Sequence, residues 1–453
     1  MNERATAPAA LVVVKSFPPL RTEPNTARLL KYLGRLAPRI DVLHGLPGWG
    51  AATGALTRDD DLATQLPPTV QRHPVSVANP LRGLKNLLRG GDGNDELGTR
   101  RRRLSPLGRL YRSLLFIPDA DYFWIWPAVR HGLRLLTELR PRVLVTSGPP
   151  FSTHLAGWVL KRLTGVPWVG HFRDLYTANP LYVPWSAWRA AFDRALERRV
   201  IGAMDAVTTV YPETTALLER RCGRPGQRYL TVRNGYDEAV FNEPPQPADG
   251  REGPPEQLSL VHGGKLLADD ADGQTAHRLL AALADLLERR PKLSENLRLT
   301  LVGKVHPSYR RVVDELGLQE TVTIAPPVTN REMIARTLAA DINLVILEDS
   351  PRNMATTGGK IYECLRAGRP ILGIMHPRCS AARLITELNA GRVAPYRDTA
   401  AISRVLEQLV DDLGSGGFAY GGPERDTFVT RTSFEHLAER FAEVLSSVFA
   451  GVD

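Results

Sequence analysis

The chain has 453 residues, of which 43% are hydrophobic and 24% are charged. This composition is ordinary for a soluble globular protein and excludes disordered, collagen-like and coiled-coil chains. The length predicts two domains, with three as an alternative. A formal net charge of +9 makes nucleic acid and anionic membranes candidate partners on composition alone.

The positive charge is confined to the first half of the chain. Residues 1–235 carry 34 basic and 18 acidic side chains, a net charge of +16, whereas the remaining residues carry a net charge of −7. Only eight of the 58 basic residues are lysines. A basic half joined to an acidic half predicts two parts with different partners.

Cysteine usage and hydropathy indicate the compartment. Cys222, Cys364 and Cys379 are far apart and form neither a CxxC nor a Cys/His ligand spacing, so we expect no disulfide scaffold and no metal site. The apolar run Leu11–Val14 is too short for a signal peptide and is followed by Lys15. The sequence contains no apolar run long enough to span a membrane. We therefore expect a cytoplasmic protein, either free or peripheral on the inner face of the plasma membrane.

Strand-like and helical segments alternate in the first half. The β-branched run Leu11–Val14 precedes an amphipathic segment over Thr26–Leu36, and residues 47–66 are expected to form a loop. Further predicted strands are Ile40–Leu43, Val143–Thr146 and Trp168–Phe172, and further predicted helices are Phe151–Leu163 and Trp185–Met204. Short apolar strands that alternate with helices predict a parallel sheet buried on both faces.

The alternation pauses and then restarts in the second half. Residues 242–257, rich in Pro, Gly and charge, predict a linker. The strands predicted after it are Leu258–Val261, Leu297–Val302, Val322–Ile324, Ile342–Leu347 and Pro370–Ile374, and the helices are Ala276–Arg289, Tyr309–Leu316, Arg331–Leu338 and Lys360–Ala367. The predicted fold class is therefore α/β, with two Rossmann-like, doubly wound parallel sheets at residues 1–241 and 258–430. An amphipathic helix over 431–449 can pack on either domain.

Residues 80–115 differ from this pattern because leucines alternate with basic side chains. Residues 81–113 contain nine basic and three acidic side chains, a net charge of +6. Such a segment gains from leucine burial and from anionic headgroups, so it is a candidate membrane or acceptor surface. A solvated loop with a charge run is the alternative. The basic residues of this candidate surface are Arg82, Lys85, Arg89, Arg100, Arg101, Arg102 and Arg103.

Glycine–lysine pairs mark a candidate anion site in the second half. Gly263-Gly264-Lys265 and Gly303-Lys304 end predicted strands, and Gly358-Gly359-Lys360 begins a predicted helix. Glycines let the backbone approach a phosphate, helix starts present free N–H groups, and a lysine completes the site. This favours a diphosphate pocket, with turn glycines and solvated lysines as the alternative. The sequence contains no Walker A and no GxGxxG pattern, which disfavours an ATPase or a dinucleotide dehydrogenase.

Two further groups complete the candidate site. Glu363, one turn into the predicted helix, could bind ribose hydroxyls, although complementing the helix start would also explain it. The predicted donor-binding residues are Gly264, Lys265, Gly303, Thr357, Gly358, Gly359, Lys360 and Glu363. In the first half, His171, Arg173 and Asp174 end a predicted strand as a candidate base, phosphate fork and orienting carboxylate. An Arg–Asp pair that stabilises a loop is equally consistent.

Four segments occur in an informative order. Residues 172–175 read FRDL, residues 234–241 carry NG-x-D-x-x-x-F, residues 264–266 read GKL, and residues 359–370 read GK-x-x-E-x-L-x-x-G-x-P. This ordered set resembles the family 4 retaining glycosyltransferases of the GT-B fold. In that family a second glutamate often stands where this chain has Ala355.

The resemblance implies a sugar-nucleotide enzyme. The second domain would bind a UDP- or GDP-sugar, with Lys265 and Lys360 on the diphosphate and Glu363 on the ribose, while Arg173 and Asp174 of the acceptor domain would face the cleft. It implies metal-independent hexosyl transfer, with retention and without a cofactor, to a hydroxyl of a lipid-linked or envelope glycan acceptor in polysaccharide biosynthesis.

Other functions remain open. They are transfer to a soluble natural product, sugar-nucleotide epimerisation on the same fold, and a non-catalytic basic protein that binds nucleic acid or membranes. Nucleic acid is disfavoured because the basic segment is interleaved with leucine rather than with stacking aromatic residues. The expected partners are therefore a nucleotide-sugar donor and a glycan, lipid-linked or small-molecule acceptor, with an anionic membrane surface as a further candidate.

Overall fold

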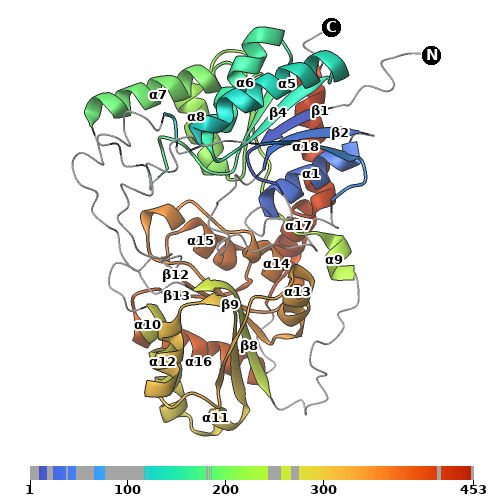
Figure 1. The fold of residues 1–453 in the computed structure, drawn as a ribbon. Coiled ribbons are helices and arrows are strands. Elements are labelled where there is room, and N and C mark those ends of the chain that lie inside the picture. The colour runs from blue at the N-terminus through green and yellow to red at the C-terminus, as the bar shows by residue number, and fades with distance from the viewer. Residues whose placement is uncertain are drawn as a thin grey trace. The chain divides into compact units, whose positions relative to one another are not determined.

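The computed structural model describes residues 10–17, 24–36, 39–46, 66–76, 117–119, 121–179, 182, 184, 186–242, 257–266, 275–415 and 420–449. The chain divides into two compact units. Unit 1 comprises residues 1–94, 102–233 and 434–453, and unit 2 comprises residues 95–101 and 234–433. Each unit is built on one parallel β-sheet with helices packed against it (Figure 1).

The sheet of unit 1 has seven parallel strands in the order β3-β2-β1-β4-β5-β6-β7. The strands are β1 (Ala10–Val14), β2 (Ile40–Gly45), β3 (Val70–Val75), β4 (Val143–Gly148), β5 (Trp168–Phe172), β6 (Ala206–Thr209) and β7 (Arg228–Thr231). The helices are α1 (Pro24–Leu36), α5 (Ile125–Leu139), α6 (Phe151–Thr164), α7 (Ala187–Ile201), α8 (Pro212–Cys222) and α18 (Phe434–Phe449), with a 3-10 turn η2 at Tyr122–Trp124.

Alternating side chains of β1 enter two different cores, as the period of a strand buried on both faces requires. Ala10 and Val12 pack with α1 and α18, whereas Leu11 and Val13 pack with α5 and α6. The final helix α18 follows unit 2 in the sequence but contributes Phe441 and its neighbours to the core of unit 1.

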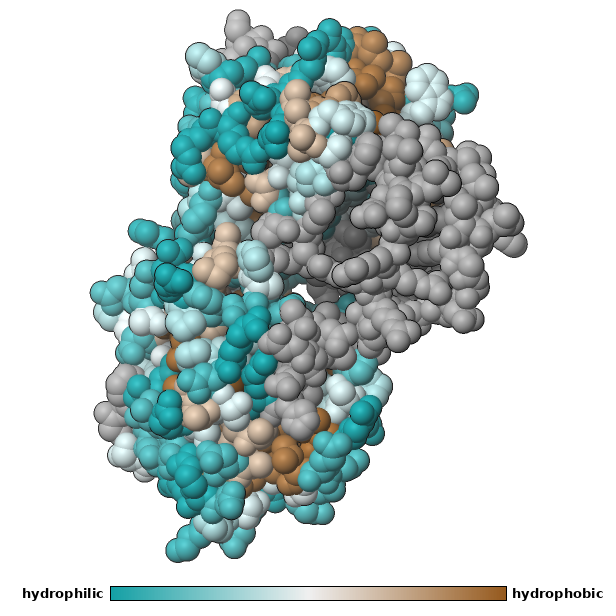
Figure 2. Space-filling view, turned by 90° about the vertical axis from the view of Figure 1, so that its left-hand side faces the viewer, coloured by the Kyte–Doolittle hydropathy of each residue, from teal (hydrophilic) through white to brown (hydrophobic). Residues whose placement is uncertain are grey.

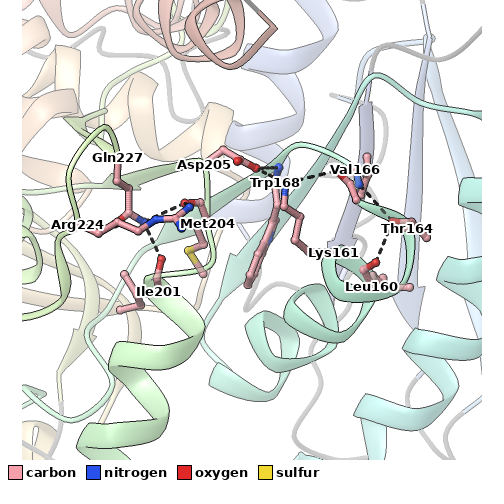
Figure 3. A network of polar contacts seen from close by, with 11 residues as sticks. Leu160, Lys161, Thr164, Val166, Trp168, Ile201, Met204, Asp205, Arg224 and Gln227 are labelled. Carbon is pink, nitrogen blue, oxygen red and sulfur yellow. Dashed lines mark hydrogen bonds and ion pairs between the residues drawn. The ribbon is translucent and has the colours of Figure 1, made fainter. Parts of the chain in front are cut away.

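A polar network joins the segments that lead into β5, β6 and β7 (Figure 3). Asp205 Oδ2 accepts hydrogen bonds from Lys161 Nζ at 2.8 Å and from the backbone N–H of Trp168 at 2.7 Å. Gln227 Nε2 donates to the carbonyl oxygen of Ile201 at 2.7 Å. Ligands of doubly wound sheets bind at the opposite, carboxyl ends of the strands, so we assign this network a structural role.

The sheet of unit 2 has six parallel strands in the order β10-β9-β8-β11-β12-β13. They are β8 (Leu258–Leu266), β9 (Leu297–Val305), β10 (Val322–Ala325), β11 (Ile342–Ile346), β12 (Ile371–Met375) and β13 (Gly391–Pro395). The helices are α9 (Glu238–Asn242), α10 (Thr275–Arg289), α11 (Lys292–Asn296), α12 (Pro307–Glu315), α13 (Asn330–Ala339), α14 (Lys360–Ala367), α15 (Ser380–Glu387), α16 (Thr399–Ser415) and α17 (Pro423–Arg431), with a 3-10 turn η3 at Pro351–Asn353. One core joins the sheet to α10, α12 and α16, and another joins it to α14 and α15.

The boundary between the units differs from the predicted boundary. The sequence placed residues 234–241 in the first domain, but the structure places them in unit 2. The physical reason is apolar packing, because Tyr236 and Phe241 form a buried cluster with Ile334 of α13. Most of the predicted linker, residues 243–256, lies outside the described residues.

The visible face of the molecule is largely hydrophilic, with hydrophobic residues in separate patches (Figure 2). The exposed large hydrophobic side chains among the described residues are Leu46, Trp126, Leu133, Leu163, Trp188, Phe192 and Leu413. Within the described ranges, no helix has the length and apolar character needed to cross a membrane. The basic segment 80–115, with all seven basic residues of the candidate membrane surface, lies outside the described residues.

Candidate functional site

A cavity of about 270 Å³ opens in unit 2 at the carboxyl ends of β8 and β11. β8 pairs with β11 only at Leu260 and Val261, whereas its pairing with β9 continues to Leu266. The two strands therefore separate at the point where the strand order reverses. This switch point is where doubly wound sheets bind ligands. Met333 and Thr337 of α13 and the start of α14 complete the lining.

Glycines allow β8 and β9 to lie very close together beside this cavity. Gly264 has a φ of +154° and Gly303 a φ of +135°, values that residues with a side chain rarely adopt. A Cβ atom at position 303 would overlap the carbonyl oxygen of Gly264. The structure places Gly264 and Lys265 in the cavity lining, but Gly303 supports Gly264 from the neighbouring strand and is not part of the lining.

Lys360, the first residue of α14, reaches across to β8. Its Nζ donates a hydrogen bond to the carbonyl oxygen of Gly263. The side chain is open to solvent at the cavity, yet the surrounding protein atoms desolvate the ammonium group and lower its pKa, while the charge of Glu363 acts in the opposite direction. A Cβ atom at Gly264 would overlap Lys360 Nζ, so the glycine makes room for the ammonium group.

The start of α14 is open to an anion. Gly358 has a φ of +67°, and Gly359 is the N-cap residue. Gly359 has no side chain, so the N-cap residue itself provides no side-chain hydrogen bond to this helix start. Its first N–H groups and their partial positive charge lie beside the cavity, and Glu363 is the acidic residue of this first turn. In unit 1, by contrast, Asp119 Oδ2 occupies the start of α6 by accepting from the backbone N–H of Ser152 at 2.8 Å.

The remaining predicted donor-binding residues also line the cavity. Thr357 Oγ1 is hydrogen-bonded to Tyr362 Oη at 3.1 Å, which fixes the approach to α14. Glu363 Oε1 accepts from Asn330 Nδ2 at 3.4 Å, which joins α14 to α13. Among the described residues, no group of three or more His, Cys, Asp and Glu side chains could hold a metal ion.

His262 also lines the cavity, although it belongs to none of the predicted glycine–lysine motifs. The side chain is 5% exposed, and its Nδ1 lies 3.0 Å from the carbonyl oxygen of Leu344. Burial, and then the charge of Lys360, lower its pKa to about 4. Its position in the sequence could have indicated a role in the site. His262 is a polar residue in an apolar strand, directly before the Gly263-Gly264 pair of the candidate phosphate site.

The three residues predicted to be catalytic lie in unit 1, at the end of β5. His171 is buried, its Nδ1 is 2.9 Å from Thr208 Oγ1, and burial lowers its pKa to about 3, so the ring is neutral at pH 7. Arg173 Nε donates to the carbonyl oxygen of Gly148 at 3.2 Å, and its Nη2 donates to the next carbonyl oxygen at 2.8 Å. The guanidinium group therefore holds the turn after β4, and the half-buried Asp174 follows it.

Buried histidines predict a loss of stability in mild acid. His154, His171 and His262 have pKa values lowered by burial to about 3, 3 and 4. The unfolded chain binds more protons below pH 6.5, so stability is present above that pH and falls as the pH decreases. Each histidine should cost about 2 kcal/mol of unfolding free energy between pH 7 and pH 5. Urea unfolding at both pH values measures the sum; equal stabilities would contradict this prediction.

Known proteins resemble this chain in sequence. Residues 71–235 match the family model of the Glycosyl transferase 4-like domain. A D-inositol 3-phosphate glycosyltransferase of Corynebacterium efficiens is 25% identical over 272 residues, which are 56% of this chain and 60% of the relative. Another, from Streptomyces avermitilis, is 26% identical over 230 residues, which are 48% of this chain and 46% of the relative. The matches thus span about half the length of these relatives.

Solved structures resemble the chain over its full length. Sucrose-phosphate synthase from Thermosynechococcus elongatus has a TM-score of 0.64 at 16% identity, covering 98% of this chain and 99% of that one. The trehalose 6-phosphate synthase of Burkholderia multivorans has a TM-score of 0.60 at 14% identity, covering 99% and 100%. The chain has the GT-B fold. This confirms the predicted fold class, and the two parallel sheets are the two α/β domains of GT-B.

Proposed function

We propose that the chain is a metal-independent, retaining glycosyltransferase that moves a hexose from a UDP- or GDP-sugar to a hydroxyl of a lipid-linked or envelope glycan. One observation carries the donor part of this proposal. At the switch point of unit 2, the lysine Lys360, the close-packed Gly263-Gly264 backbone and the uncapped start of α14 surround a single cavity. This combination suits a diphosphate. The match of residues 71–235 and the GT-B fold support the transferase part.

The proposed chemistry is electrostatic. The bond between the anomeric carbon and a diphosphate oxygen breaks, and the acceptor oxygen bonds to the same face of that carbon and releases its proton to solvent. Lys360 and the N–H groups of Gly358 and Gly359 stabilise the charge that develops on the departing diphosphate. Glu363 would accept hydrogen bonds from the ribose hydroxyls, in competition with its present bond from Asn330.

A thermal shift experiment tests the donor site. We expect UDP or GDP to raise the melting temperature of the full chain in the presence of EDTA, because ligand that binds only the folded protein stabilises it by mass action. Adenosine diphosphate at the same concentration is the control for non-specific anion binding. If neither UDP nor GDP shifts the transition at millimolar concentration, the donor-site assignment is wrong.

Turnover separates transfer from epimerisation. Structures with the same fold include a UDP-GlcNAc 2-epimerase from Neisseria meningitidis, with a TM-score of 0.56 at 13% identity. A transferase releases the nucleoside diphosphate only when an acceptor is supplied, and the anomeric coupling constant of its product reports retention. An epimerase changes the sugar of the donor without any acceptor. Two relatives are named D-inositol 3-phosphate glycosyltransferases. These names support a small soluble acceptor as the main alternative to an envelope glycan.

The exposed face of α7 supports a membrane-associated acceptor. Trp188 and Phe192 are 50% and 44% exposed and lie one helical turn apart. Arg194, Arg198 and Arg199 are exposed on the same helix. Aromatic side chains beside arginines fit the headgroup region of an anionic bilayer, where apolar burial and charge attraction act together. We propose that this helix face contacts the membrane that carries the acceptor.

Liposome sedimentation tests the membrane contact. At low salt, the double variant Trp188→Ser/Phe192→Ser should bind vesicles that contain phosphatidylglycerol about tenfold more weakly, because two partly exposed aromatic side chains no longer insert. Trp126→Ser is the matched control, since Trp126 is 73% exposed but lies on α5. Equal binding of the double variant and the wild type would remove α7 from the contact, and no binding by the wild type would favour a soluble acceptor.

A further inference from the structure

The cavity of unit 2 contains one buried polar atom that the proposed chemistry leaves unused. Nε2 of His262 is buried and, among the described residues, has no hydrogen-bond partner. Nδ1 is held 3.0 Å from the carbonyl oxygen of Leu344. A carbonyl oxygen only accepts, so Nδ1 carries the hydrogen and the neutral ring presents a lone pair at Nε2. A buried polar atom without a partner is costly, so a ligand group that completes this bond is favoured.

The missing side chain of Gly264 locates the space that Nε2 faces. A Cβ atom at this position would lie 3.3 Å from His262 Nε2 and would overlap Lys360 Nζ. The imidazole nitrogen and the ammonium group therefore both lie next to Gly264, and both side chains line the cavity beside the start of α14. A group bound there meets a fixed ammonium, open backbone N–H groups and the imidazole, a combination that suits a phosphate oxygen.

The groups around His262 explain why it is neutral in the free protein. From α14, Lys360 is the charged side chain that acts on the ring, and Glu363 on the same helix acts on Lys360. On the other side, β11 and α13 bring the uncharged Leu344 and Met333. The positive charge of Lys360 opposes protonation of the ring. An anion bound between the ammonium group and the ring would instead favour the protonated form.

We propose that His262 takes up one proton from solvent when a phosphate group of the nucleotide enters this space, and then donates from Nε2 to a phosphate oxygen. The proposal rests on the proposed donor site. A neutral ring would place its lone pair against a phosphate oxygen, so anion binding and protonation are linked. The proton returns to solvent when the nucleotide leaves. Because the released diphosphate carries one more negative charge than the sugar nucleotide, a charged His262 favours departure of the leaving group.

Proton uptake measured by calorimetry tests this directly. UDP, GDP and inorganic pyrophosphate are titrated into the full chain at pH 6, in buffers with different enthalpies of protonation. We expect the wild type to take up close to one proton more than His262→Gln, whose amide can donate but cannot be protonated. The ligand's own titration is common to both proteins and cancels in this difference. Wild-type affinity should also fall about tenfold per pH unit as the pH rises from the pKa of the free histidine to the higher pKa of the bound one, unlike that of the variant.

His262→Asn separates the linkage from a structural role. Its amide can still donate to the carbonyl oxygen of Leu344 but leaves no nitrogen at the position of Nε2, so we expect a folded protein that binds nucleotide without the extra proton. If the wild type and both variants bind with the same proton balance, His262 stays neutral and this proposal is overturned while the donor site stands. If no probe binds to the wild type, the donor site itself is wrong and both proposals fail.

Discussion

Lys360→Ala should abolish the stabilisation of the protein by UDP or GDP and lower kcat/KM for transfer by at least about a hundredfold, the scale on which removal of one group that stabilises developing charge acts. The ammonium group lies against the Gly263 carbonyl oxygen at the edge of the donor cavity. Desolvation already lowers its pKa, so the free protein gains little from holding it there. We therefore expect the unliganded variant to melt near the wild-type temperature.

Two further variants define the cause of that loss. Lys292→Ala removes an exposed lysine from α11, away from the cavity, and should leave nucleotide stabilisation unchanged. Lys360→Arg keeps the charge but not the compact ammonium group and should restore part of the thermal shift. A Lys360→Ala protein that retains the full nucleotide shift would place the diphosphate elsewhere and contradict the assigned site.

The buried strands were predictable from sequence because apolar side chains on both faces leave a continuous apolar run. Trp168–Phe172 and Leu258–Val261 were identified in this way, and the structure contains both in β5 and β8. Three edge strands, β3, β7 and β13, were not predicted, whereas the edge strand β10 was predicted as Val322–Ile324. β3 reads VQRHPV and β7 reads RYLT, with partly exposed side chains that interrupt the apolar pattern. Sequence periodicity therefore detects strands with a continuous apolar run better than strands in which polar side chains interrupt it.

The candidate site was predictable where the backbone requires glycine, because glycines beside lysines are visible in the sequence. Glycines beside lysines at strand ends and helix starts selected Gly264, Lys265 and Lys360, which line one cavity. Gly303 is also followed by a lysine, but here the glycine allows two strands to lie close together. The sequence pattern alone does not distinguish this role from phosphate binding. His262 belongs to no such pattern, because its role depends on the Leu344 carbonyl oxygen of a strand 82 residues away in the sequence.

Gly303→Ala should destabilise unit 2 by more than about 3 kcal/mol, because a new Cβ atom combines steric overlap with an unfavourable φ. The overlap is with the carbonyl oxygen of Gly264, a backbone atom that pairing along β8 and β9 prevents from moving. Gly317→Ala is the matched control. Its φ of +66° is also positive, but a Cβ atom there would meet nothing within 4 Å. It should cost only about 1–2 kcal/mol.

The distribution of tryptophan allows the two units to be followed separately in the full chain. All seven tryptophans precede residue 235, so their fluorescence reports unit 1, whereas far-ultraviolet circular dichroism reports both units. Urea unfolding of Gly303→Ala should therefore show an early transition by circular dichroism and an unchanged one by fluorescence. Equal losses of unfolding free energy in Gly303→Ala and Gly317→Ala would mean that the positive φ alone causes the loss. A greater loss of unfolding free energy at position 303 would show that the close contact of β8 and β9, and not φ alone, restricts this position to glycine.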